Sequence, residues 1–294
     1  MNAPETAGLQ GELDRFLASM PIEKLSGELA LRCGMTEDDA KSFLMEYVNE
    51  MQITLDLVDG NIRTGSRILE VGAGLCLFSV FLKALGHDVV ALEPSAGGFG
   101  TFETAKKVIL ESYADVCLTV WESTAQDLPA RGERFDLIFS NNVLEHIPDL
   151  AGAWSGMCAA LKPEGAMLHN CPNYLFPYEP HLGIPVLKPW PQLSALLFRG
   201  AVAKQKEVWE SLNFVTYFQV KKLVRDSGMR VAFRKGLLLH ALRRIGDDAL
   251  FRERHSGSVV EIAYTSLDKL HLLGLLRFVP PMLATPMIFR CTRA

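Results

Sequence analysis

The fold of this chain is decided by the stretch RILEVGAGLCLFSVFLKALGHDVVALEPS, residues 67–95. A short apolar run leads into a turn that contains Gly72 and Gly74, and apolar residues then recur at helical spacing. A second apolar run ends in Glu93. This order predicts a strand, a glycine loop, a helix and a second strand that ends in an acid, which is the unit that binds a nucleoside in doubly wound α/β folds.

The spacing has a direct chemical reason. Glycines let the backbone approach a ligand that a Cβ atom would push away. A carboxylate at the end of the second strand can accept hydrogen bonds from two vicinal ribose hydroxyls, and Glu93 stands at that position. The competing interpretation is an ordinary βαβ unit with a tight turn. Glu70, placed before the first glycine, and Glu93 together favour the nucleoside site.

The residues Glu70-Val71-Gly72-Ala73-Gly74 resemble the first motif of class I S-adenosylmethionine-dependent methyltransferases. A dinucleotide-binding dehydrogenase would more often show G-x-G-x-x-G, whose third glycine is Leu77 here. The resemblance implies that the cofactor is S-adenosyl-L-methionine. It implies cofactor contacts at Glu70, Gly72, Ala73, Gly74, Glu93, Pro94, Thr124, Ala125 and Asn141.

Two later stretches extend this resemblance. Residues 135–149, FDLIFSNNVLEHIPD, resemble a second family pattern, which implies that Asn141 lines the methionine end of the cofactor. Residues 123–129, STAQDLP, resemble the stretch that holds adenine, with Thr124 where the family often has an acid. The adenine is therefore expected against the backbone of Ala125, and Asp127 is the weaker candidate.

The expected fold class is α/β, a doubly wound, seven-stranded and mostly parallel sheet with helical additions, whose last strand is antiparallel by the resemblance. Residues 1–60 are expected to form a helical lead-in, and residues 61–294 the methyltransferase domain with insertions at about 172–210 and 239–282. The lead-in has three possible uses: it covers the cofactor site, builds a homodimer or only covers the edge of the sheet. The further strands are expected at 116–121, 135–140, 166–171, 229–238 and 283–293.

Composition limits the possible functions. The chain has 294 residues, 49% of them hydrophobic, and a net charge of -4, which gives no general attraction to nucleic acid. Six cysteines form no C-x-x-C pair and, with seven histidines, no zinc pattern, so no metal is expected. The N-terminus has no apolar signal region, which favours a cytoplasmic location. The basic segment 221–254 is either a solvated helix face or a surface for peripheral membrane contact or an anionic substrate.

The insertion after the fifth strand is where an acceptor is expected, because ligands bind beyond the carboxyl ends of the strands in this fold class. Its prolines exclude a regular helix over residues 172–191. Tyr178, Glu179 and His181 are the candidate substrate contacts. The stretch is similar to one in bacterial methyltransferases associated with glycans, lipids and other small metabolites. The family resemblance as a whole is to the small-molecule, ubiquinone-biosynthesis-like type. The competing interpretation is a rigid structural loop.

Methyl transfer is an in-line displacement at a sulfonium carbon, and a hydroxyl acceptor must also lose its proton. Histidine is the usual base because its pKa lies near the working pH. His181 is the first candidate and His146 the second. The preferred function is therefore O-methylation of a small-molecule, glycan-linked or lipid-linked acceptor, with carbon or nitrogen methylation also compatible.

Two other functions are weighed against this one. A non-catalytic S-adenosylmethionine-binding module or partner subunit is suggested by Cys76 and Thr124, which depart from the common family pattern. Methylation of nucleic acid is compatible with the basic segment 221–254. The N-P-P-[YF] motif used on base amines is absent, however, since residues 140–143 read Ser-Asn-Asn-Val.

Overall fold

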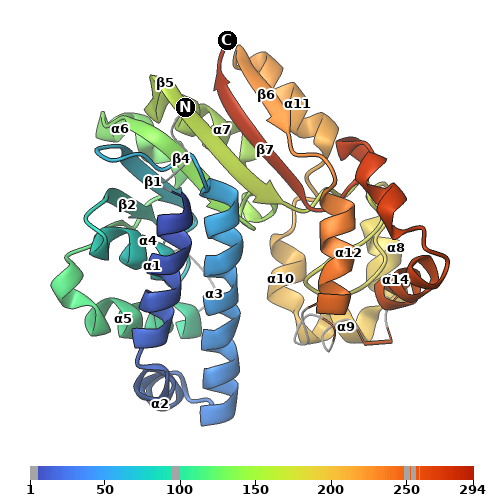
Figure 1. Cartoon of the computed structure of the whole chain (residues 1–294), viewed down its shortest axis with the longest axis horizontal. Coiled ribbons are helices and arrows are strands. Elements are labelled where there is room, and N and C mark those ends of the chain that lie inside the picture. The colour runs from blue at the N-terminus through green and yellow to red at the C-terminus, as the bar shows by residue number, and fades with distance from the viewer. Residues whose placement is uncertain (1–5, 95–99, 248–251, 253–255, 258) are drawn as a thin grey trace. The chain divides into compact units, whose positions relative to one another are not determined.

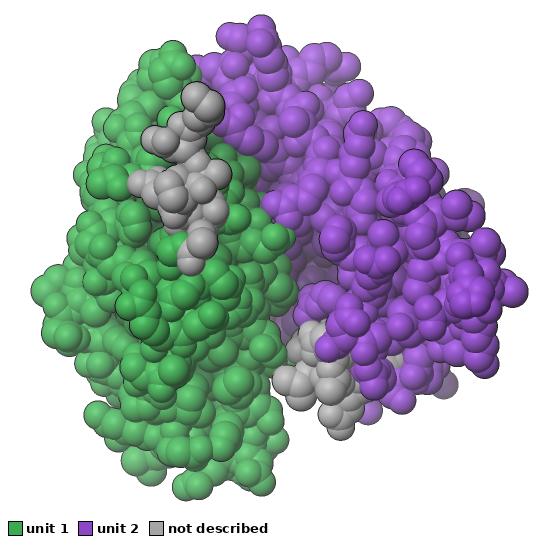
Figure 2. Space-filling view, in the orientation of Figure 1, with its two compact units in different colours: residues 1–141, 152–168 green, residues 142–151, 169–294 purple. Residues whose placement is uncertain are grey.

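The computed structural model describes residues 6–94, 100–247, 252, 256–257 and 259–294. The chain divides into two compact units. Unit 1 comprises residues 1–141 and 152–168, and unit 2 comprises residues 142–151 and 169–294 (Figure 2). The separate domain boundary expected at residue 60 stays a prediction.

The strands form one seven-stranded sheet in the order β3-β2-β1-β4-β5-β7-β6 (Figure 1). β1 pairs in parallel with β2 and with β4, and β2 pairs in parallel with β3. β6 and β7 pair antiparallel, as expected for the last strand. The mostly parallel α/β sheet is thus confirmed. The strands span Arg67–Val71 (β1), Asp88–Leu92 (β2), Thr119–Trp121 (β3), Phe135–Asn141 (β4), Leu161–Cys171 (β5), Met229–Phe233 (β6) and Met287–Arg293 (β7).

Three strand boundaries differ from the sequence expectation. β3 begins three residues later than expected, because a short 3-10 helix, Ala114–Val116, and the left-handed residue Cys117 (φ 53) come first. β5 begins earlier, at Leu161, and includes the residues expected to form a turn. β6 ends at Phe233, since the chain turns and enters a helix at Leu237.

The helical lead-in consists of α1 (Thr6–Ser19), α2 (Ile22–Cys33) and α3 (Glu37–Val58). Thr36 caps α3, since its side chain accepts a hydrogen bond from the Asp39 amide at 3.1 Å. One face of α3 is buried and includes Leu44, Met51 and Leu55. The other helices up to the end of α7 are α4 (Leu77–Ala84), α5 (Gly100–Ser112), α6 (Leu128–Arg131) and α7 (Leu150–Ala160).

Unit 2 contains both expected insertions. Residues 172–190 form turns without a helix, as their prolines predict. Thr216 begins α11 with a capping box that pairs it with Gln219. Among the described residues no helix is long and apolar enough to cross a membrane. The helices are α8 (Pro191–Leu197), α9 (Arg199–Lys204), α10 (Lys206–Ser211), α11 (Tyr217–Asp226), α12 (Leu237–Asp247) and α14 (Val259–Lys269).

Candidate active site

The glycine loop after β1 has alternating left-handed residues. Gly72, Gly74 and Cys76 have φ values of 69°, 57° and 62°. Such values are uncommon for a residue with a Cβ, so the thiol-bearing Cys76 completes a turn that glycine would adopt more easily. A Cβ built on Gly74 would lie 3.5 Å from Tyr47 Cε1 and 3.6 Å from Phe102 Cζ. The space beside the loop is thus closed by two aromatic rings.

Glu93 lies at the carboxyl end of β2 and is hydrogen-bonded to the glycine loop. Its Oε2 accepts a hydrogen bond from the Gly74 amide at 2.8 Å. Burial raises the pKa of the Glu93 carboxyl to about 7, and the Gly74 amide opposes part of that rise. A half-buried carboxyl with acceptor capacity beside two glycines fits a ribose diol, which is the contact that the sequence predicts.

Glu70 has a different surrounding. It is 7% exposed, and the Ser79 hydroxyl of α4 donates a hydrogen bond to its Oε2. Burial raises the pKa of Glu70 to about 8, while the bond from Ser79 opposes the rise. Glu70 thus ties β1 to α4. Its contact with the cofactor stays a prediction, as do those of Ala73 and Pro94.

The lead-in supplies site residues that the sequence did not single out. Asn141, at the end of β4, donates through Nδ2 to Glu50 Oε2 at 2.7 Å and to Thr54 Oγ1 at 3.1 Å. Both partners lie on α3, and so does Tyr47 beside the loop. The sequence signal that could have identified them is the presence of Thr54 and Glu50 on an otherwise apolar helix. Within unit 1, the lead-in therefore packs on the ends of the strands that carry the predicted cofactor contacts.

The loop expected to hold adenine is stabilised by a capping box between Thr124 and Asp127. Asp127 Oδ2 accepts from the Thr124 amide at 3.0 Å and from the Thr124 hydroxyl at 2.7 Å. Asp127 is thereby engaged within its own loop. Ala125 is 5% exposed. A Cβ on Gly156 of α7 would lie 1.9 Å from the Ala125 carbonyl oxygen, so Gly156 is needed for this close packing.

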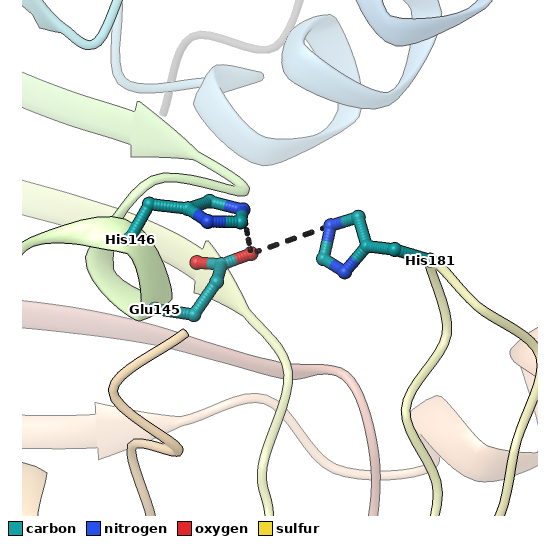
Figure 3. A group of neighbouring side chains, drawn as sticks. All are labelled: Glu145, His146 and His181. Atoms are coloured by element: carbon teal, nitrogen blue, oxygen red, sulfur yellow. Dashed lines mark ion pairs between the residues drawn. The ribbon is translucent and has the colours of Figure 1, made fainter. Parts of the chain in front are cut away.

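The two candidate bases lie together in unit 2 (Figure 3). His146 belongs to a short 3-10 helix after β4, Leu144–His146. His181 belongs to the proline-rich loop, residues 172–190. Their ring centroids are 5.2 Å apart. Glu145 Oε1 lies 4.0 Å from the Nε2 atom of each histidine, and both rings face this carboxylate (Figure 3). The sequence named both histidines separately, without any indication that they meet.

His181 is oriented by Glu179. His181 Nδ1 is 2.6 Å from Glu179 Oε1, and Glu179 is fully buried. The same carboxylate accepts from the Leu182 amide at 2.5 Å and from the Tyr174 hydroxyl at 3.2 Å. Burial by itself would raise the pKa of Glu179, but the bonds from His181 and the backbone amides hold it below its usual value. A charged Glu179 fixes Nδ1 of His181 as the donor, so Nε2 is the nitrogen at which this ring gains or loses a proton.

His146 is fixed in the same way by a hydroxyl. Its Nδ1 is 2.7 Å from Ser211 Oγ, and Ser211 donates to the Val208 carbonyl at 2.7 Å. Because the hydroxyl proton is used there, Ser211 accepts from His146 Nδ1, and Nε2 is the free acceptor. Burial, with the neighbouring His181, lowers the pKa of His146 to about 4. His146 is therefore neutral at physiological pH.

The aromatic residues of the proline-rich loop divide into two groups. Tyr174 and Tyr178 are buried, and the Tyr174 ring packs against Phe214 with centroids 5.1 Å apart. Trp190 is 63% exposed. Tyr174 thus acts as a support for Glu179, and the substrate contact predicted for Tyr178 stays a prediction.

Comparison with known proteins gives three findings. A family model described as a methyltransferase domain matches residues 69–169. An uncharacterized protein of Mycobacterium tuberculosis is 35% identical over 236 residues, which cover 78% of this chain and 79% of that protein. The ubiquinone biosynthesis O-methyltransferase of Azorhizobium caulinodans is 32% identical over 112 residues, which cover 37% of this chain and 41% of the enzyme.

Solved structures are more distant in sequence. The geranyl diphosphate C-methyltransferase of Streptomyces coelicolor, solved with Mg²⁺, geranyl diphosphate and S-adenosyl-L-homocysteine, is 14% identical with a TM-score of 0.49. The alignment covers 84% of this chain and 78% of that enzyme.

Proposed function

This chain belongs to the class I S-adenosylmethionine-dependent methyltransferases, and on that premise we propose that it methylates a hydroxyl group of a small-molecule, glycan-linked or lipid-linked acceptor. The observation that carries the proposal is the pair of a buried carboxylate, Glu179, and a histidine, His181, at 2.6 Å. Such a pair leaves one imidazole nitrogen ready to accept a proton.

The cofactor is S-adenosylmethionine, which supplies an already activated methyl group. In the proposed arrangement, Glu93 accepts from the ribose hydroxyls and the loop from Gly72 to Gly74 lets the backbone approach. The backbone at Thr124 and Ala125 holds the adenine, and Asn141 lines the methionine end. These residues bind and orient; they contribute no proton transfer.

His181 supplies the acid–base step in this proposal. Its Nε2 accepts the proton of the acceptor hydroxyl while the new carbon–oxygen bond forms. Glu179 positions the ring and stabilises the imidazolium that results. His146, the second candidate, has its pKa lowered to about 4 and is the weaker base.

The acceptor class is supported by the ubiquinone biosynthesis relatives, which act at oxygen by name. The similarity spans about two fifths of their length. The acceptor class is therefore part of the proposal. A homodimer, peripheral membrane contact and a cytoplasmic location remain predictions from the sequence.

The test is an acceptor screen with mapping of the product. The full chain is incubated with S-adenosylmethionine carrying a ¹³C-labelled methyl group and with phenolic, sugar and lipid-linked hydroxyl compounds. The expected product carries a methyl whose carbon shift is that of a methoxy group, and His181→Ala abolishes its formation. His240→Ala, an exposed histidine of α12 in the same unit, is the matched control.

Two outcomes would contradict the proposal. A methyl found on nitrogen or carbon would replace O-methylation. Binding of S-adenosylhomocysteine without turnover of any acceptor would favour a non-catalytic binding module.

A further inference from the structure

We propose that Glu145, His146 and His181 bind one divalent transition-metal ion. One ligand atom from each of these residues lies within 4.8 Å of the other two. The carboxylate oxygen Glu145 Oε1 is 4.0 Å from each histidine Nε2 (Figure 3). Two imidazoles and one carboxylate on one side of a metal, with the other positions open, form a known class of metal site.

The hydrogen bonds around the cluster direct the lone pairs. His181 Nδ1 is bonded to Glu179 Oε1 at 2.6 Å, and His146 Nδ1 to Ser211 Oγ at 2.7 Å. Each histidine thus has its Nδ1 engaged by a hydrogen bond, and its Nε2 is the nitrogen turned toward the Glu145 carboxylate. A metal ion at this point would take the place of any proton on the two Nε2 atoms, which must be unprotonated to bind it, and would neutralise the Glu145 carboxylate.

The distances are those of an open site that closes on an ion. Metal–nitrogen and metal–oxygen bonds of about 2.0–2.2 Å put neighbouring ligand atoms about 3.0–3.5 Å apart. The separations of 4.0 Å here shorten to that range with side-chain movements of about 1 Å or less. All three ligands belong to unit 2, so no rearrangement of the two units is involved.

The residues behind the histidines match the usual support of metal ligands. A metal-bound histidine commonly donates its other N–H to a carboxylate or another oxygen, which fixes its orientation and makes it a stronger ligand. Glu179 and Ser211 take this role here, and Tyr174 holds Glu179 in turn. Asn213 holds the backbone segment that carries Glu145 and His146, because its Nδ2 donates to the Leu144 and Ile147 carbonyls at 2.7 and 2.9 Å.

The burial leaves one side open. The Glu145 side chain is fully buried, whereas those of His146 and His181 are 28% and 27% exposed. An ion here would keep coordination positions for water or for an acceptor oxygen. Nitrogen ligands favour zinc, cobalt, nickel or iron over magnesium, which prefers oxygen ligands and retained waters.

The use of the ion rests on the proposed function, although its binding does not. An acceptor hydroxyl bound to the ion would have a lowered pKa, so its proton leaves to water as the carbon–oxygen bond forms and the carbon–sulfur bond breaks. His181 is then a ligand, and the ion takes over the activation assigned above to the histidine base. Glu145 and His146 are neighbours in the sequence, but His181 comes from a separate segment, so the three form no spacing motif and the sequence predicted no metal.

The test is metal binding by the full chain after treatment with a chelator. We expect calorimetric titration with Zn²⁺ to show one site, and Co²⁺ to give the visible absorption of a bound ion with nitrogen ligands. Mg²⁺ should not compete. Glu145→Gln and His181→Ala should each weaken Zn²⁺ binding at least about 100-fold, and Ser211→Ala, which removes a supporting oxygen, about 10-fold.

Controls separate ligand loss from misfolding. His240→Ala should bind Zn²⁺ as the wild type does, and each variant should retain its affinity for S-adenosylhomocysteine, whose predicted contacts are in unit 1. If a variant fails that control, His181→Asn replaces His181→Ala. Zn²⁺ binding that is absent, or that is unchanged in Glu145→Gln and His181→Ala, would overturn the proposal.

Activity then distinguishes the two proposals. Metal binding without any methyl transfer would keep this site and reject the proposed function. Methyl transfer that persists after chelation, with no Co²⁺ absorption, would reject the metal site and keep the histidine base.

Discussion

Buried carboxyls behave in opposite ways in the two units. In unit 1, burial raises the pKa of Glu70 to about 8 and that of Glu93 to about 7. In unit 2, Glu179 is fully buried, yet its pKa lies below the usual value. The difference comes from the donors. The Gly74 amide donates to Glu93, and the hydroxyl and amide of Ser79 donate to Glu70. Glu179 has more donors, namely a histidine, backbone amides and a tyrosine. Glu93 thus keeps acceptor capacity for a ligand, whereas Glu179 uses its capacity to hold His181 in place.

The largest effect is expected when the charge of Glu179 is removed. Glu179→Gln keeps the size of the side chain but no longer fixes the tautomer of His181, so kcat for the acceptor found in the screen should fall about 100-fold or more. The measurement is steady-state kinetics. Affinity for S-adenosylhomocysteine should stay within twofold, and a parallel loss of both would show that the two regions are not independent.

Glu70 tests a carboxyl whose pKa is raised by burial, in contrast to the lowered pKa of Glu179. A carboxyl whose folded pKa is about 8, against about 4.3 when unfolded, costs stability progressively as the pH rises between those values. Glu70→Gln should remove a slope of up to about 1.4 kcal/mol per pH unit from the free energy of unfolding in that window. Urea unfolding between pH 5 and pH 9 measures it, and a variant with the slope of the wild type would refute the raised pKa.

Gly74 tests the backbone of the cofactor loop. Gly74→Ala places a Cβ on a residue with φ 57°, which costs about 1–2 kcal/mol, and should weaken binding of S-adenosylhomocysteine about tenfold. The matched control is Gly132→Ala, where φ is 69° and the space around the new Cβ is open. That control should lose similar stability without losing affinity in calorimetric titration. Equal losses of affinity in both would assign the effect to general strain.

The smallest effect is expected at the adenine loop. Thr124→Ala removes the hydroxyl that donates to Asp127 and should lower the free energy of unfolding by about 1 kcal/mol. Cofactor affinity should change less than threefold, because the predicted adenine contact is the backbone of Ala125. Thermal unfolding and cofactor titration measure the two quantities. A large loss of affinity with unchanged stability would make Thr124 a direct contact.

The sequence predicted those features that depend on neighbouring residues. Apolar runs that end in glycine, an acid or asparagine predicted β1, β2 and β4, and the glycine loop followed from residues 72–74. The start of β3 was missed because it depends on the left-handed conformation of Cys117. The bond from Asn141 to Glu50 joins residues 91 positions apart, and no periodicity reports such a contact. The same reason hid the meeting of His146 with His181.

The most direct test of the account is calorimetric titration of S-adenosylhomocysteine into the wild type and Glu93→Ala. Two charge-assisted hydrogen bonds to the ribose contribute about 1.5–3 kcal/mol each, so the variant should lose at least about 100-fold in affinity. Glu164→Ala, an exposed carboxylate of unit 1, should bind as the wild type does. Equal affinity in Glu93→Ala and the wild type would contradict the assignment of the ribose contact and, with it, the placement of the cofactor in the glycine loop.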